Sequence, residues 1–124
     1  MLKSIIIMMF FCTSLYAGDF TVKSLEEAKK LSQSTNQPIL LIFGSPHCSF
    51  CNKLTMDIQN GSLTEYLDAY IICYVDLEKN EEYKDKYKIN MIPDSRIISN
   101  DKETSKATGY KKNEYIQWLK NAKR

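Results

Sequence analysis

PILLIFGSPHCSFCNKL, residues 38–54, predicts a strand, a turn and a helix in immediate succession. The apolar run Ile39–Phe43 has the length and residue types of a buried strand. Residues Gly44–Pro46 favour a turn that ends this strand, and the helix is expected to begin near Cys48. Two cysteines, Cys48 and Cys51, therefore fall at the start of a helix that directly follows a buried strand.

This placement gives the two thiols different chemistry. The first turn of a helix carries unpaired backbone N–H groups and the positive end of the helix dipole, both of which stabilise a thiolate at Cys48. Cys51 lies one turn later, close enough to attack a mixed disulfide formed at Cys48. The spacing predicts that Cys48 and Cys51 are a catalytic pair that forms a redox-active disulfide.

Three neighbouring residues are candidates for tuning the pKa of Cys48. If His47 is protonated, its adjacent positive charge lowers that pKa, whereas a His47 that simply faces solvent from the loop has no such effect. The sequence leaves both interpretations open. Ser49 can donate a hydrogen bond to the thiolate, and Phe50 offers an apolar contact to a substrate or partner.

The N-terminal residues have the pattern of a secretory signal. Lys3 supplies the positive charge, Ile5–Phe11 the apolar core, and Ala17 the small residue before cleavage. We therefore expect a signal peptide over residues 1–17, a mature domain over residues 18–124 and a periplasmic location. The alternative is an uncleaved membrane anchor, although the uncharged stretch is shorter than the ~20 residues that span a bilayer. Lipid attachment at Cys12 is disfavoured by the bulky residues before it.

Export changes the cysteine count. Loss of the signal removes Cys12 and leaves Cys48, Cys51 and Cys73. This odd number argues against a purely structural disulfide framework, and the loop between Cys48 and Cys51 is too short to stabilise a fold usefully. Cys73 alternates in phase with Ile71 and Val75, so it is expected to be a buried core thiol. A regulatory or intermolecular disulfide at Cys73 is the open alternative.

Length and charge bound the class of protein. The chain has 124 residues, enough for one domain, and a formal net charge of +2 with dispersed basic residues. These features give no reason to expect nucleic-acid binding, and a monomer is expected. The charged segment 78–88 fits a solvated helix and loop.

The rest of the sequence alternates helix and strand signals. A capping box at Ser24–Glu27 starts a helix that Asn36–Pro38 stops, and a second capping box is expected at Ser62–Glu65. An abbreviated first strand is expected at Asp19–Val22. After the strand and helix described above, the predicted elements are a short helix to 68, a strand at 70–75, a helix at 81–87, antiparallel strands at 96–99 and 104–107, and a helix at 113–122. This order indicates an α/β fold, a central mixed β-sheet flanked by helices on both faces.

The chain resembles the thioredoxin family, in particular its exported bacterial members. The matching residues are Ile39–Phe43 before Cys48–Cys51, Val75–Asp76, Ile92–Pro93, Gly109 and Trp118. The resemblance implies a thioredoxin-like fold and a thiol–disulfide oxidoreductase. It also implies that Pro93 follows a cis peptide bond beside the cysteines, and that the Ile92 backbone binds an extended substrate segment.

The chain departs from the family at several positions. Many thioredoxins carry a buried aspartate that assists proton transfer at the second cysteine, and Ile42 stands there instead. Deprotonation of Cys51 must then rely on water or another side chain. His47 replaces the usual tryptophan, and Ser49–Phe50 replaces glycine–proline. Asp94 follows Pro93 in place of a small hydroxyl residue, and is expected to put an acid near the substrate groove.

The expected function is reduction or exchange of disulfides in extracytoplasmic client proteins, without a cofactor. The cysteine pair is expected to be reduced in turn by an electron-donor protein, with a membrane-bound donor as one alternative. One alternative is a non-catalytic adaptor that binds peptides through the same groove. A metal-binding protein using His47, Cys48 and Cys51 is a further alternative, disfavoured because the chain has one histidine and no second Cys-x-x-Cys.

Overall fold

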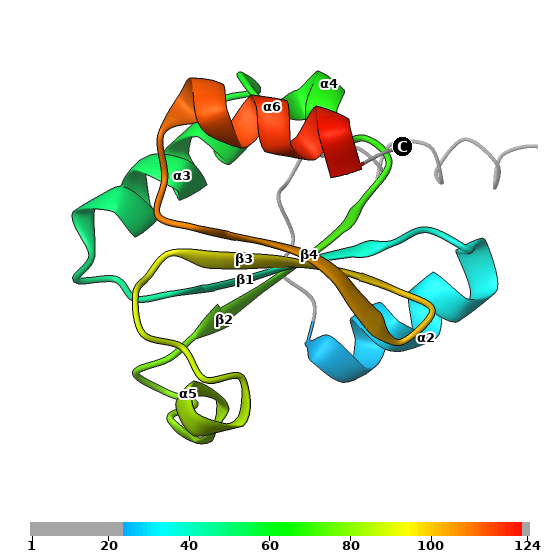
Figure 1. The fold of residues 1–124 in the computed structure, drawn as a ribbon, viewed down its shortest axis with the longest axis horizontal. Helices are drawn as coiled ribbons and strands as arrows, with labels where there is room; N and C mark the ends of the chain where they lie inside the picture. Colours follow the sequence, from blue (N-terminus) through cyan, green and yellow to red (C-terminus); the bar gives the residue numbers. More distant parts are fainter. Residues whose placement is uncertain (1–23, 123–124) are drawn as a thin grey trace, which may run out of the picture.

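The computed structural model describes residues 24–122, in which helices and strands follow the predicted order (Figure 1). The expected signal peptide and the expected strand at Asp19–Val22 lie outside these residues. The elements are α2 (Leu25–Thr35), β1 (Ile39–Gly44), α3 (Ser49–Gln59), α4 (Thr64–Leu67), β2 (Ile71–Asp76), α5 (Glu82–Lys86), β3 (Asp94–Ser99), β4 (Lys102–Thr108) and α6 (Lys112–Ala122). Within residues 24–122, no helix has the length and apolar character needed to cross a membrane.

The strands form one mixed sheet in the order β2-β1-β3-β4. β1 pairs in parallel with β2 and antiparallel with β3, and β3 and β4 form an antiparallel hairpin. Every residue of β1 is buried, as expected for a strand with neighbours on both sides and helices on both faces. The predicted mixed sheet is therefore confirmed, and its apolar run is the inner strand.

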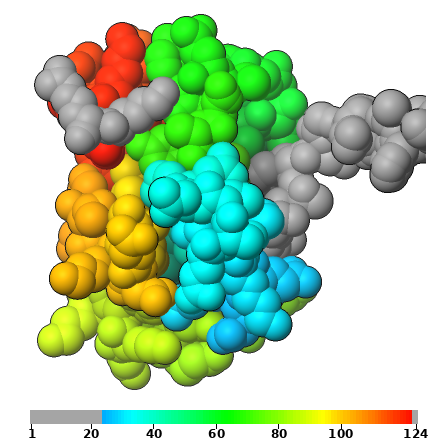
Figure 2. All heavy atoms as spheres, turned by 90° about the vertical axis from the view of Figure 1, so that its right-hand side faces the viewer, coloured from blue at the N-terminus to red at the C-terminus, as the bar shows by residue number. Residues whose placement is uncertain are grey.

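Helices cover both faces of the sheet, also as predicted (Figure 1). α2 and α5 pack on the face that receives Leu41 and Phe43 of β1. α3, α4 and α6 cover the other face, which receives Leu40 and Ile42. Seen from the side, residues following α2 (cyan) lie beside the β3–β4 hairpin (yellow to orange; Figure 2). Cys73 is fully buried on the α2 face, as predicted, and burial raises its pKa to about 11.

The two capping predictions had different outcomes. Ser24 and Glu27 form the predicted capping box at the start of α2, and Asn36 in the left-handed conformation ends that helix. The second capping box is wrong, because α4 begins at Thr64 after Leu63 with no side-chain cap. The Ser62 hydroxyl donates instead to the Asp57 carbonyl at the end of α3, 3.2 Å away. Ser62 thus belongs to the exit from α3 rather than to the entry of α4.

The strand β3 begins two residues earlier than predicted and includes a buried ion pair. Asp94 and Arg96 are only 1% and 4% exposed, and the guanidinium donates to both Asp94 carboxylate oxygens, at 2.8 Å and 3.0 Å. Arg96 also stacks near the rings of Phe43 and Tyr87. The expectation that Asp94 presents an acid to the substrate groove is therefore wrong, since its carboxylate is buried and neutralised. The sequence pattern missed the first two residues of the strand because a charged residue, Asp94, stands at its start.

Replacing Arg96 with methionine is expected to lower the free energy of unfolding by about 3–5 kcal/mol, because Asp94 is left as an unpaired buried charge. The double variant Asp94→Leu/Arg96→Met removes both charges and should recover most of the loss. Urea denaturation measures both values. Glu103→Gln is the control: Glu103 is a partly exposed partner of Arg96, so its loss should cost less than about 1 kcal/mol. An Arg96→Met variant as stable as the parent chain would contradict this assignment.

Candidate active site

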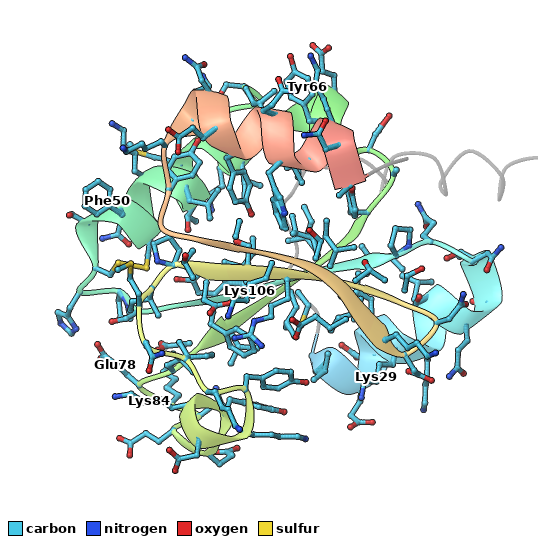
Figure 3. All side chains as sticks on the ribbon, in the orientation of Figure 1. Lys29, Phe50, Tyr66, Glu78, Lys84 and Lys106 are labelled. Carbon is cyan, nitrogen blue, oxygen red and sulfur yellow. A yellow bond between two sulfur atoms is a disulfide. The ribbon has the colours of Figure 1, made fainter. Side chains whose placement is uncertain are left out.

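The cysteine pair lies where β1 leaves the sheet and α3 begins. Cys48 is the N-cap residue of α3, one position before the helix proper, and its Sγ accepts the backbone N–H of Cys51 at 3.2 Å. The predicted position of Cys48 at the start of this helix is therefore confirmed, and stabilisation of its thiolate stays a prediction. Figure 3 shows the disulfide at this edge of the sheet, between Phe50 above and Glu78 below.

Cys48 and Cys51 are joined in a disulfide, with their Cα atoms 5.2 Å apart. The two residues differ in access: Cys48 is partly exposed, whereas Cys51 is 0% exposed beneath the first turn of α3. Only Cys48 can therefore be reached directly by a large substrate. This asymmetry matches the predicted roles of an attacking and a resolving cysteine.

The loop before β3 lies against the same sulfur. The Ile92–Pro93 peptide bond is cis, as the family resemblance implied, and the Ile92 carbonyl lies 3.8 Å from Cys48 Sγ. The Gly109 N–H donates to the Pro93 carbonyl at 2.8 Å, and the positive φ of Gly109, 83°, suits a residue without a side chain. Pro93 is buried while Ile92 is partly exposed, so the Ile92 backbone borders the open side of the disulfide.

His47 fits neither sequence interpretation completely. Its side chain is 81% exposed, yet Nδ1 lies 2.9 Å from a carboxylate oxygen of Glu78. The hydrogen bond to Glu78, followed by the charge of Glu78, raises the pKa of His47. The imidazole thus faces solvent and also forms an ion pair when protonated.

Glu78 and Ser45 complete a small polar network that sequence analysis missed. The Ser45 hydroxyl donates to the Glu78 carboxylate and accepts the His47 backbone N–H at 3.1 Å. The hydrogen bonds that the Glu78 carboxylate makes with the Ser45 hydroxyl first and then with His47 Nδ1 lower the pKa of Glu78. A signal was available, because the parallel pairing of Gly44 with Asp76 brings the residues that follow both strands to one edge of the sheet.

Phe50 lines an apolar groove next to the cis Ile92–Pro93 peptide bond. The groove has a volume of about 700 Å³, and its apolar walls come from Phe50, Met91, Ile92, Tyr115 and Trp118. Phe50 and Met91 are each 58% exposed, so this groove presents two large apolar side chains to solvent. Ser49 is also exposed. In the disulfide state Cys48 carries no charge, so hydrogen bonding from Ser49 to a thiolate stays a prediction.

A metal site at the cysteine pair would need further ligands close by. Among residues 24–122, no three His, Cys, Asp or Glu side chains come together in an arrangement that could hold an ion.

The thioredoxin family model matches residues 20–121, and the chain belongs to this family. With a Cys-x-x-Cys disulfide at the N-terminus of α3, it is a thiol–disulfide oxidoreductase. A search of curated proteins found no match.

Solved structures show the same fold at low sequence identity. The germline-specific thioredoxin Deadhead of Drosophila melanogaster is 15% identical, with a TM-score of 0.67 over 83% of this chain and 98% of that one. Fasciola hepatica thioredoxin is 19% identical, with a TM-score of 0.66 over 79% of this chain and 93% of that one. A Thermus thermophilus thioredoxin is 18% identical, with a TM-score of 0.69 over 80% and 83%.

Glu78→Gln is expected to lower the pKa of His47 toward its ordinary value, because the carboxylate that stabilises the imidazolium is removed. His47 is the only histidine of the chain, so an NMR titration of the imidazole reports it without ambiguity. A raised pKa means that the pair stabilises the fold fully below the ordinary histidine pKa and loses this effect as the pH rises through the folded value. Glu81→Gln, a neighbouring change outside the network, is the control. An unchanged His47 titration in Glu78→Gln would show that the ion pair does not form.

Proposed function

We propose that this chain is an exported reductase of protein disulfides that uses the Cys48/Cys51 couple. The observation that carries the proposal is the accessible Cys48 sulfur, bonded to a buried Cys51 and bordered by the backbone of Ile92. An exchange enzyme requires this combination, because one sulfur must contact the client disulfide while the other stays inaccessible to the client.

The reaction begins with the dithiol form. The Cys48 thiolate attacks a client disulfide, forms a mixed disulfide and releases one client sulfur as a thiolate. Cys51 loses its proton and attacks Cys48 Sγ, which releases the second client sulfur and forms the Cys48–Cys51 disulfide. Two electrons pass from the protein to the client, and an electron-donor protein then returns the pair to the dithiol.

Client binding is proposed to use backbone pairing and the apolar groove together. An extended client segment pairs with the Ile92 backbone, which holds its sulfur over Cys48. Alternate side chains of that segment point to the two sides, so one set meets the groove formed by Phe50, Met91 and Trp118. The groove chemistry favours segments with apolar residues beside the disulfide.

The electrostatics of the site support reduction rather than oxidation. A couple becomes strongly oxidising when the thiolate of its reduced form is well stabilised. His47 supplies a cation next to Cys48, but the Glu78 carboxylate 2.9 Å from Nδ1 offsets that charge. Thiolate stabilisation then comes mainly from the helix N-terminus, including the Cys51 N–H.

Cys48→Ser is expected to abolish the reduction of insulin by dithiothreitol in the presence of the protein, because the attacking sulfur is lost. Cys51→Ser is expected to trap mixed disulfides with client proteins, which non-reducing electrophoresis detects. Cys73→Ser is the matched control, since the Cys73 thiol is buried on the opposite face of the sheet and should leave turnover unchanged. Parent-like turnover in both active-site variants would refute the exchange mechanism.

Export and reduction can be tested together in the cells that make the protein. After acid quenching and thiol alkylation, we expect the chain in the extracytoplasmic fraction, beginning at Gly18, with Cys48 and Cys51 mainly reduced. Ile7→Lys places a charge in the apolar stretch and should keep the chain in the cytoplasm. A full-length chain recovered with the membrane would instead support the uncleaved anchor, and a fully oxidised pair would contradict a reductive role.

A further inference from the structure

Gly44, the last residue of β1, lies where two functional groups converge. A Cβ atom built on Gly44 would overlap the Tyr74 hydroxyl and would lie 3.1 Å from Cys51 Sγ. The phenol oxygen and the resolving sulfur therefore border the same small space above the Gly44 Cα. Any side chain at this position would displace one of them, so a glycine is required here by close approach rather than by backbone conformation.

Tyr74 reaches this space from the neighbouring strand. Its register partner on β1 is Ile42, and its side chain crosses diagonally toward Gly44, which lies two residues further along β1. The ring packs within the cluster that includes Leu54 of α3. The Thr55 hydroxyl of α3 donates to the Cys51 carbonyl at 2.9 Å, and its proximity lowers the pKa of the phenol. The hydroxyl is thereby held under the first turn of α3.

The resolving cysteine needs a polar neighbour of this kind. Cys51 is 0% exposed, and burial disfavours the thiolate that must form before Cys51 can attack. Ile42, also 0% exposed, stands where many thioredoxins carry an acid that assists Cys51. A hydrogen bond donated to the developing thiolate lowers the cost of its formation, and a phenol is a suitable donor.

We infer that the Tyr74 hydroxyl donates a hydrogen bond to the Cys51 sulfur as the mixed disulfide is resolved, an inference that rests on the exchange reaction proposed above. Cys51 gives its proton to solvent, and its sulfur bonds to Cys48 Sγ. The bond between Cys48 and the client sulfur breaks, and that sulfur leaves with the electron pair and takes up a proton. In this step Cys51 is oxidised and the client sulfur is reduced, Cys48 stays at the disulfide level, and Tyr74 keeps its own proton throughout.

The surroundings favour this role as a neutral donor. Burial and the charge of Asp76 raise the pKa of Tyr74, while the nearby Thr55 hydroxyl opposes the shift. The phenol therefore stays protonated over the range in which thiols titrate. Asp76 on β2 is the charged group that acts on Tyr74 within the described residues, and the facing helix α3 contributes Thr55 and Cys51.

Tyr74→Phe removes only the proposed donor and tests the inference directly. Stopped-flow mixing of the reduced protein with 5,5′-dithiobis(2-nitrobenzoate) resolves two releases of thionitrobenzoate, the first on attack by Cys48 and the second on resolution by Cys51. We expect an unchanged first phase and a second phase about tenfold slower near neutral pH. The pH profile of the second phase should shift upward, because Cys51 then forms its thiolate at higher pH.

Two further variants distinguish this role from a structural one. Tyr70→Phe is the matched control: its hydroxyl donates to the Leu119 carbonyl on the same face of the sheet, away from the cysteines, so both phases should keep their pH profiles. Gly44→Ala displaces the phenol without deleting it, should shift the second phase in the same direction, and serves if Tyr74→Phe does not fold.

The outcomes separate this inference from the proposed function. A folded Tyr74→Phe variant whose second phase has the parent rate and pH profile overturns the role of Tyr74 and leaves the exchange reaction intact. Loss of the first phase in the parent chain would contradict the exchange reaction itself.

Discussion

The burial of β1 on all sides is the constraint on which the site depends. β1 is an inner strand of the sheet, with β2 in parallel on one side and β3 antiparallel on the other, and each of its residues is buried. A strand fixed by two neighbours and two helical layers cannot slip in register without exposing its apolar side chains. Its end at Gly44 therefore fixes where the turn begins, and with it the position of Cys48 at the start of α3.

The strand β2, which pairs in parallel with β1, leads to the acidic residue of the site. Because β1 and β2 end at the same edge of the sheet, Glu78 after β2 meets Ser45 and His47 after β1. The antiparallel partner β3 instead starts at that edge, directly after the cis Ile92–Pro93 bond, so it brings the Ile92 carbonyl to Cys48. The end of β1 therefore lies beside Glu78 on the β2 side and beside the Ile92 backbone on the β3 side.

The sequence predicted the order of elements, the mixed sheet and the cysteine pair, because each depends on a local pattern. Ile39–Phe43 is a short apolar run between turn residues, and Cys48 and Cys51 are adjacent in the chain. The sequence pattern did not predict features that depend on contacts between particular side chains. The burial of Asp94 depends on its pairing with Arg96, whose guanidinium lies over the rings of Phe43 and Tyr87. Glu78 looked like one of several solvated charges, since its partners are more than thirty residues away.

Gly44 connects the packing of the sheet with the chemistry of the resolving sulfur. At the end of β1 it leaves room for the phenol of Tyr74, so a core position without a side chain permits a polar group beneath a buried thiol. Ile42 on the same strand supplies apolar packing where a carboxylate would need its own compensation in a buried site. A neutral phenol avoids that cost, since it carries no charge to bury, yet it still offers one hydrogen to a sulfur that becomes negative. The polar group that assists Cys51 thus belongs to β2 rather than to β1, and Gly44 at the end of β1 leaves the space that this group occupies.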